Sequence, residues 1–254
     1  MRRLLVPLVA SFAAACGSPT SPIEPPRGAD PSAVGSAATS ASSVRPAASA
    51  PPTPTASVSA APAATSAPAA ELPKELTVLV IGDSFAQALG LGLKHREREL
   101  GMRVLIRGQQ ATYIPEWAGP NRGVDRMVRA DAPDLVLIAL GGNELAMTTP
   151  EIRRPKVAEL VAKVGDIPCV WLSPPLWNIK DNGLLGVIRG ASSPCRYFDS
   201  DKLVPSVPRG SDKIHPSAEG QRVWADGLLA WMRGELTPPA GKAKLALRPR
   251  PDSE

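Results

Sequence analysis

The chain has 254 residues, a formal net charge of +5 and only 4% aromatic residues. The modest charge, without a platform of interleaved basic and aromatic residues, argues against a nucleic-acid-binding protein. Large apolar residues are scarce before residue 74, so one ordinary hydrophobic core is expected, over 74–236.

The first residues have the parts of an export signal. Arg2 and Arg3 form a positive region, residues 4–12 form an apolar stretch too short to span a bilayer, and three alanines precede Cys16. One interpretation is an ordinary signal peptide with an incidental Cys16. The other, which we favour, is a bacterial lipoprotein: residues 1–15 are removed, and a lipidated Cys16 anchors the exported chain to a membrane of the cell envelope.

Residues 16–73 are dominated by Ala, Pro, Ser and Thr. Such a segment cannot bury enough apolar surface to offset the entropy of ordering. We therefore predict a disordered tether over 16–73 and a disordered basic tail over 237–254.

Between these segments, apolar runs alternate with helix-like stretches. In chain order, the sequence predicts strands and helices alternately at 75–81, 84–101, 103–108, 122–130, 133–144, 151–165, 167–175, 183–188, 196–200 and 215–236. This alternation predicts an α/β fold, a three-layer α/β/α domain with a central, mostly parallel sheet. Ligands of such folds bind beyond the carboxyl ends of the strands.

The motif Gly82-Asp83-Ser84 stands where the first strand passes into a helix. Ser84 has two interpretations. It caps the helix, or it is a nucleophile whose hydroxyl projects at the sheet edge, where the helix N-terminus favours negative charge.

A nucleophilic serine needs a base, and the chain has two histidines. His95 lies in a highly charged helical stretch, where we expect it to be solvated. His215 begins the last predicted helix, three residues after Asp212. A carboxylate at that spacing can orient one imidazole nitrogen and leave the other free to accept a proton. The alternative is a surface turn that Asp212 caps.

Asn143 follows two glycines at the end of the third predicted strand. Its amide can donate a hydrogen bond to an oxyanion. The alternative is that Gly141-Gly142-Asn143 is only a turn.

The order of these motifs resembles the SGNH hydrolase family, the GDSL-type esterases and lipases, over residues 76–234. The resemblance implies a flavodoxin-like fold in which Ser84 is the nucleophile, His215 its base and Asp212 the residue that orients the base. It also implies an oxyanion hole, which holds the negatively charged oxygen of the intermediate. The hole is formed by the N–H of Ser84, the N–H of Gly108 and the side chain of Asn143.

Two positions depart from the family pattern. The second oxyanion N–H belongs to Gly108 or, by alignment on strand length, to Ala111. Glu144 replaces the usual Asp after the Asn, and we expect a local change there without loss of the chemistry.

The predicted activity is that of a serine esterase. It hydrolyses an acyl or O-acetyl ester of an envelope carbohydrate, a lipid or a small molecule, without a cofactor or a metal ion. The alternatives are an O-acyltransferase on an envelope polysaccharide and a non-catalytic polysaccharide-binding module. The expected partners are the ester substrate and, through Cys16, a membrane, but no nucleic acid.

Several side chains keep two interpretations. Cys169 and Cys195 either form a disulfide in the oxidising compartment or remain thiols. Tyr113 and Trp177 lie in loops near the expected site, where each contacts substrate or only packs. Trp171, on the fourth predicted strand, is expected in the core.

Overall fold

A computed structural model of the chain describes residues 71–236 and 245–247. The predicted signal segment and Cys16, together with most of the predicted tether and tail, lie outside the described residues. Within the described ranges, no helix has both the length and the apolar character that a membrane span requires.

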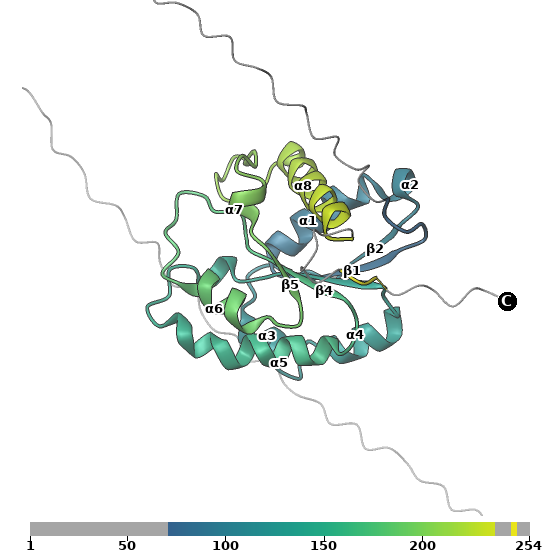
Figure 1. The fold of residues 1–254 in the computed structure, drawn as a ribbon. Coiled ribbons are helices and arrows are strands. Elements are labelled where there is room, and N and C mark those ends of the chain that lie inside the picture. Colours follow the sequence, from purple (N-terminus) through teal and green to yellow (C-terminus); the bar gives the residue numbers. More distant parts are fainter. Residues whose placement is uncertain (1–70, 237–244, 248–254) are drawn as a thin grey trace, which may run out of the picture. The chain divides into compact units, whose positions relative to one another are not determined.

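A five-stranded parallel sheet forms the centre of the domain (Figure 1). Its strands are β1 Thr77–Gly82, β2 Arg103–Ile106, β3 Leu135–Ala139, β4 Cys169–Leu172 and β5 Arg196–Phe198, in the order β2-β1-β3-β4-β5. The predicted α/β class with a parallel sheet is confirmed. Since the chain moves from β1 outward to β2 and then back to β3, the β1/β3 boundary is the switch point where ligands bind in such sheets.

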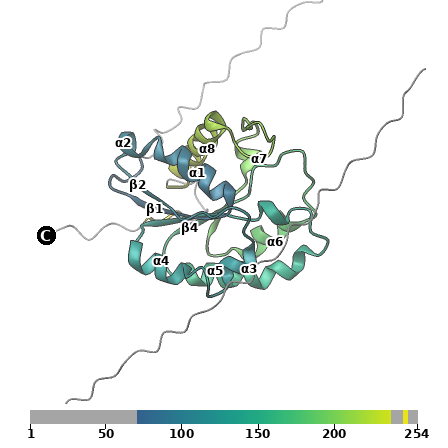
Figure 2. The ribbon, with the colours of Figure 1, turned by 180° about the vertical axis from the view of Figure 1, so that it is seen from behind.

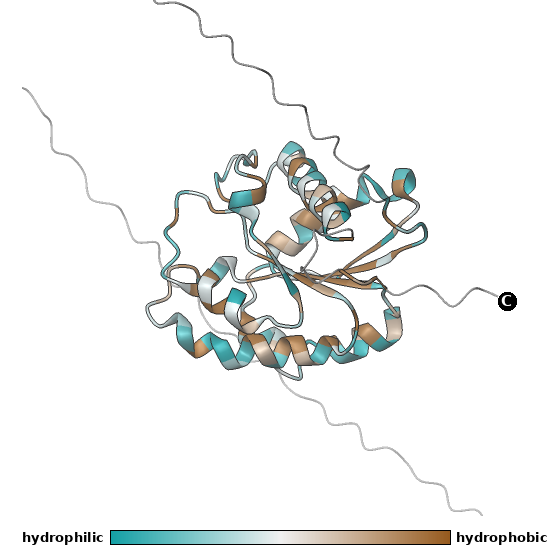
Figure 3. Ribbon diagram, viewed as in Figure 1, coloured by the Kyte–Doolittle hydropathy of each residue, from teal (hydrophilic) through white to brown (hydrophobic). Residues whose placement is uncertain are grey.

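Helices cover both faces of this sheet. On one face lie α1 Ser84–Lys94, α2 Glu97–Leu100, α7 Ser200–Leu203 and α8 Ala218–Leu236; on the other lie α3 Ile114–Ala118, α4 Val124–Asp131, α5 Arg154–Val164 and α6 Leu184–Ala191 (Figures 1 and 2). The central strands β1, β3 and β4 are almost wholly apolar and are buried along their length, because both faces of the sheet are covered (Figure 3).

Side-chain alternation along the strands divides the interior into two cores. Val78 and Val80 of β1 point into the core beneath α1 and α8, whereas Leu79 and Ile81 point into the core beneath α3 and α5. This period of two is that of an extended strand.

The first predicted helix is divided in two. It ends at Lys94, and α2 begins at Glu97 after a turn in which the N–H of Arg96 donates to the carbonyl of Leu93. The charged stretch between Leu93 and Leu100 offers no apolar side chain to the core, so packing does not favour a continuous helix there. His95 is exposed, as expected.

The last helix also begins later than predicted. α8 starts at Ala218, and His215 lies in the loop before it, next to an isolated bridge between Arg209 and Pro216. Helices α3 and α7 have no counterpart among the predicted elements.

Two buried leucines lie outside the predicted domain range of 74–236. Leu72 and Leu245 both belong to the core beneath α1 and α8, and Leu245 is only 3% exposed. The N–H of Leu245 donates to the carbonyl of Glu235 at 2.9 Å.

Cys169 and Cys195 form a disulfide between the start of β4 and the residue before β5. Both half-cystines are buried. Trp171 is fully buried on β4, and its indole N–H donates to the carbonyl of Leu140.

Candidate active site

Ser84 and His215, 131 residues apart in sequence, meet at the carboxyl end of the sheet. Ser84 is the first residue of α1, directly beyond β1, and its Oγ lies 2.9 Å from Nε2 of His215. This is the distance of a normal hydrogen bond and within the reach that proton transfer requires.

The other nitrogen of His215 contacts Asp212. Nδ1 lies 2.6 Å from Oδ2 of Asp212, while Oδ1 accepts the backbone N–H groups of Ile214 and His215. The hydrogen bond from His215, and then those from the two backbone N–H groups, lower the pKa of Asp212 to about 2. An ionised Asp212 favours the tautomer with a proton on Nδ1, which leaves Nε2 free to accept the proton of Ser84.

The cap of α1 is Asp83, not Ser84. Oδ1 of Asp83 accepts the N–H of Phe85 at 2.9 Å, so the hydroxyl of Ser84 is not used for capping. The cap interpretation of Ser84 is therefore wrong. The sequence signal that points to Asp83 is an Asp immediately before a helix.

Asp83 also reaches the turn after β3. Its Oδ2 accepts the N–H groups of Gly141 and Gly142, each at 3.2 Å, and its side chain is fully buried. Burial raises the pKa of this carboxyl to about 6, against the lowering effect of the three N–H donors. One carboxylate thus connects the start of α1 to the turn that leads to Asn143.

Gly82 makes this close arrangement possible. Its φ is +135°, and a Cβ at this position would lie 2.0 Å from the carbonyl oxygen of Ala139 on β3. Only glycine fits both the conformation and the space.

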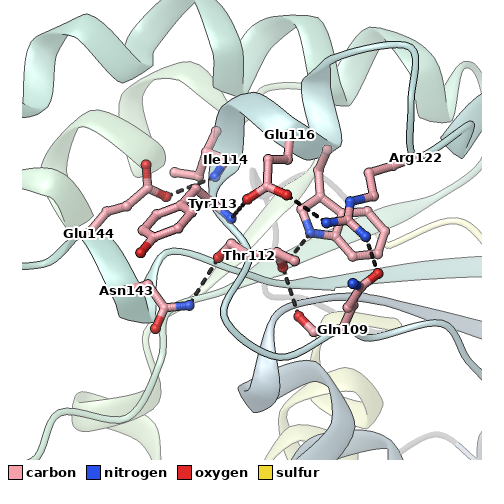
Figure 4. Close-up of polar contacts among 9 residues, drawn as sticks. Gln109, Thr112, Tyr113, Ile114, Glu116, Arg122, Asn143 and Glu144 are labelled. Carbon is pink, nitrogen blue, oxygen red and sulfur yellow. Dashed lines mark hydrogen bonds and ion pairs between the residues drawn. The ribbon is translucent and has the colours of Figure 1, made fainter. Parts of the chain in front are cut away.

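Asn143 lies on the 3-10 turn Gly142–Glu144 and faces the same cleft as Ser84. Its Nδ2 donates to the carbonyl of Thr112 at 3.0 Å (Figure 4). A primary amide has two N–H donors, so this bond orients the amide and leaves one donor for another acceptor.

Glu144 points away from the cleft. It is buried, and its Oε2 accepts the N–H of Ile114 at 2.8 Å (Figure 4). Its Oε1 pairs with Arg153. The local change expected at Glu144 is thus a contact that holds the start of α3 beside the Asn143 turn.

Further polar contacts hold the loop before α3. Oγ1 of Thr112 donates to the carbonyl of Gln109 and accepts the indole N–H of Trp117 (Figure 4). Glu116 accepts the N–H of Tyr113 and pairs with Arg122, which also contacts the side chain of Gln109. The loop is therefore held from both of its ends.

Ala111 and Gly108 occupy different places in this loop. Ala111 lines the cleft with Ser84 and Asn143 and has a left-handed φ of +54°. Gly108 is not among the residues that line this cleft, and its carbonyl accepts Nε2 of Gln87 at 3.0 Å. Of these two residues, only Ala111 lines the cleft.

The cleft has a volume of about 540 Å³, within the range of small-molecule sites. It is lined by Ser84, Gln87, Ala88, Leu91, Gln110, Ala111, Asn143, Asp212, His215, Pro216 and Gln221. Among the described residues, no group of three or more His, Cys, Asp or Glu side chains is placed to hold a metal ion.

Aromatic side chains pack behind the catalytic candidates. The ring of Phe85 stacks on Trp177 with centroids 5.5 Å apart, and its centroid lies 5.6 Å from that of His215. Trp177 therefore packs against Phe85 and does not line the cleft. Tyr113 is 44% exposed and follows Thr112, the residue that accepts from Asn143.

The sequence matches no known family description, and no curated protein is detectably similar to it. Solved structures with a similar backbone include a lipase/acylhydrolase from Enterococcus faecalis, at 16% identity over 63% of this chain and 96% of that one, with a TM-score of 0.48. The acetylxylan esterase Axe2 from Geobacillus stearothermophilus is also 16% identical, over 63% and 94% of the two chains, with a TM-score of 0.47. The α/β hydrolase LAE5 from the metagenome of Lake Arreo is 19% identical over 63% and 96%, with a TM-score of 0.43.

Proposed function

We propose that this chain is a serine esterase of the SGNH type. The observation that carries the proposal is the continuous hydrogen-bonded series from Ser84 through His215 to Asp212, with Asn143 lining the same cleft. A serine, an imidazole and a carboxylate in this order are the parts of a nucleophilic acyl-transfer site.

Ser84, His215 and Asp212 have different roles in the proposed reaction. Ser84 Oγ attacks the ester carbonyl while Nε2 of His215 takes its proton, and Asp212 stabilises the imidazolium that forms. The tetrahedral intermediate collapses when His215 gives this proton to the leaving alcohol. Water, activated by the same imidazole, then releases the acid from Ser84.

The oxyanion needs donors that point at the cleft before the reaction begins. We assign the backbone N–H of Ser84, the backbone N–H of Ala111 and the free amide N–H of Asn143. Ala111 is chosen over Gly108 because it lines the cleft. The contact from Asn143 to Thr112 supports this arrangement, since it holds the amide against the loop that carries Ala111.

The proposal is tested with nitrophenyl acetate and the Ser84→Ala variant. We expect kcat/KM to fall by at least about 10³-fold, because removal of the nucleophile leaves only the oxyanion hole and binding. The matched control is Ser206→Ala, an exposed serine outside the cleft, which is expected to retain full activity.

Two results contradict the esterase. One is equal turnover by wild type and Ser84→Ala. The other is a wild-type protein that hydrolyses no short acyl ester, sugar acetate or lipid, which leaves the non-catalytic binding module. An added alcohol that becomes acylated in place of water identifies the transferase.

We also propose that the chain is exported and anchored through Cys16. The support is the sequence of the first 16 residues alone, which lie outside the described part of the chain. Expressed at full length in a bacterium, the wild type should partition into detergent, and Cys16→Ser should partition into water. Equal partitioning of the two proteins contradicts the anchor.

A further inference from the structure

Amide side chains dominate the polar part of the cleft beyond the catalytic candidates. Three glutamines line it, Gln87, Gln110 and Gln221, in addition to Asn143. The lining contains neither Lys nor Arg, and its two titratable residues, Asp212 and His215, bond to each other. The cleft therefore combines apolar surface with uncharged amides, and its lining includes no Lys or Arg side chain.

The glutamines come from elements that meet at the nucleophile. Gln87 is three residues after Ser84 on α1, and Leu91 is one further turn along, so the three side chains share one face of the helix. α8 approaches this helix closely, since a Cβ on Gly92 would lie 2.1 Å from the carbonyl oxygen of Gln221. The cleft therefore extends from Ser84 along α1, with α8 beside it.

The proton transfer from His215 determines which part of the ester lies on the α8 side of the cleft. His215 must give its proton to the leaving alcohol, so the alcohol portion lies next to the imidazole. On this side the lining continues into Pro216 and Gln221, and Nε2 of Gln221 donates to the carbonyl of Pro216 at 3.4 Å. The α8 side is therefore the alcohol subsite.

Hydrogen bonds already made by the glutamines fix which atoms remain free. Nε2 of Gln87 donates to the carbonyl of Gly108, which leaves its carbonyl oxygen without a hydrogen bond to any described residue. The side chain of Gln110 makes no hydrogen bond within the described ranges, so its N–H donors face solvent. The glutamines of the cleft thus present both acceptors and donors, and a hydroxyl group both donates and accepts.

We propose that this amide-lined subsite, defined by Gln87, Gln110 and Gln221, selects an ester whose alcohol is an uncharged, hydroxyl-rich sugar residue. The inference rests on the proposed esterase function and names its substrate class. An anionic headgroup or uronate finds no cation in the lining. A long alkyl chain would remove water from the glutamine amides without replacing their hydrogen bonds, which costs free energy for each amide.

The first experiment compares four esters with the wild-type protein. Glucose monoacetate, ethyl acetate, galacturonic acid monoacetate and octyl acetate share the acyl group and differ in the alcohol. We expect kcat/KM for glucose monoacetate to exceed that for ethyl acetate and for the galacturonate ester by tenfold or more. For octyl acetate, kcat/KM should be no higher than for ethyl acetate.

The second experiment removes the amides at nearly constant size. Gln87→Leu and Gln221→Leu should each lower the ratio of kcat/KM for glucose monoacetate to that for ethyl acetate by about 2- to 12-fold, the range of one net hydrogen bond. Arg222→Leu is the matched control, an exposed neighbour of Gln221 outside the cleft, and should leave the ratio unchanged. A thermal melt of each variant confirms that it folds. If Gln87→Leu does not fold, the ratio measured for Gln221→Leu decides the test.

A preference for ethyl acetate, the galacturonate ester or octyl acetate overturns the inference, as does an unchanged ratio in the glutamine variants. These outcomes differ from failure of the esterase itself, which appears as Ser84-independent turnover or none. If there is no turnover, binding still tests the subsite. Methyl glucoside is titrated into Ser84→Ala, and binding is detected as changes in the NMR chemical shifts of the protein's amides. Shifts that vanish in Gln221→Leu support it, and no shift at all contradicts it.

Discussion

Asp83 holds two parts of the candidate site in one relative position. Its carboxylate accepts the N–H of Phe85 at the start of α1 and the N–H groups of Gly141 and Gly142 before Asn143. Ser84 and Asn143 are therefore not positioned independently. This carboxylate is the acceptor for three buried N–H donors, so its loss leaves them unpaired.

The raised pKa of Asp83 should be visible in how the free energy of unfolding depends on pH. Its folded pKa is about 6, above the usual 3.8, so between these values the folded protein binds a proton that the unfolded chain has lost. The free energy of unfolding should therefore fall by about 2 kcal/mol from this group as the pH rises from 4 to 6. Urea unfolding at several pH values across this window measures it.

The Asp83→Asn variant isolates this contribution, because it keeps the size of the side chain and does not titrate. We expect it to be less stable than wild type at pH 4 and above, and to lack the decline between pH 4 and 6. Its kcat should also fall, since an amide cannot accept all three N–H groups. Parallel stability curves for the two proteins would contradict the raised pKa.

The candidate residues that follow strands could be predicted because parallel strands end at one edge. Ser84, His215, Asp212 and Asn143 lie together there, and the scarcity of histidine left His215 as the sole candidate base. The choice between Gly108 and Ala111 could not be made in advance. It rests on which of the two residues lines the cleft, and the loop that carries Ala111 is bonded to Asn143, which is far from it in sequence.

Ser84 begins α1 and His215 lies just before α8, and the two helices approach each other closely at Gly92. A Cβ there would lie 2.1 Å from the carbonyl oxygen of Gln221 and 2.9 Å from the Cβ of Ala225. Gly92→Ala should therefore push α8 away from α1. We expect the free energy of unfolding to fall by about 1–3 kcal/mol, the usual cost of overpacking, and kcat to fall with it, because His215 precedes α8.

Gly234→Ala is the matched control, since this glycine of α8 has nothing within 4 Å of the added Cβ. It should stabilise the protein by about 0.5–1 kcal/mol, the helix preference of Ala over Gly. Thermal melts and nitrophenyl acetate kinetics measure both variants. A neutral Gly92→Ala would show that the two helices are not in tight contact.

The order and class of the main elements could be predicted, because apolar runs and helical periodicity are local signals. The ends of the helices could not. α1 stops at Lys94 because the following residues have no core to contact, and α8 begins only after the His215 loop. The short α3 was missed because its start depends on two hydrogen-bond acceptors. Glu116 lies within the helix, but Glu144 is far away in sequence and gives no local signal.

The hydrophobic core of the domain includes residues that precede its first strand and follow its last helix. Leu72 precedes β1, and Leu245 follows α8, yet both pack in the core beneath α1 and α8. The N–H of Leu245 donates to the carbonyl of Glu235, so this backbone N–H has a hydrogen-bond acceptor although the residue is buried. The core is therefore incomplete in a chain that ends at Leu236.

A chain shortened to end at Leu236 should be less stable than the full one. Loss of a buried leucine side chain costs about 2–5 kcal/mol, because apolar contacts disappear and a cavity remains. Leu245→Ala in the full chain should reproduce most of this loss in urea unfolding. Leu203→Ala, at a leucine that is 45% exposed, is the control and should change stability little. If the shortened chain and Leu245→Ala both unfold at the wild-type urea concentration, Leu245 does not belong to the core. If only the shortened chain unfolds at a lower urea concentration, another residue beyond Leu236 stabilises the domain.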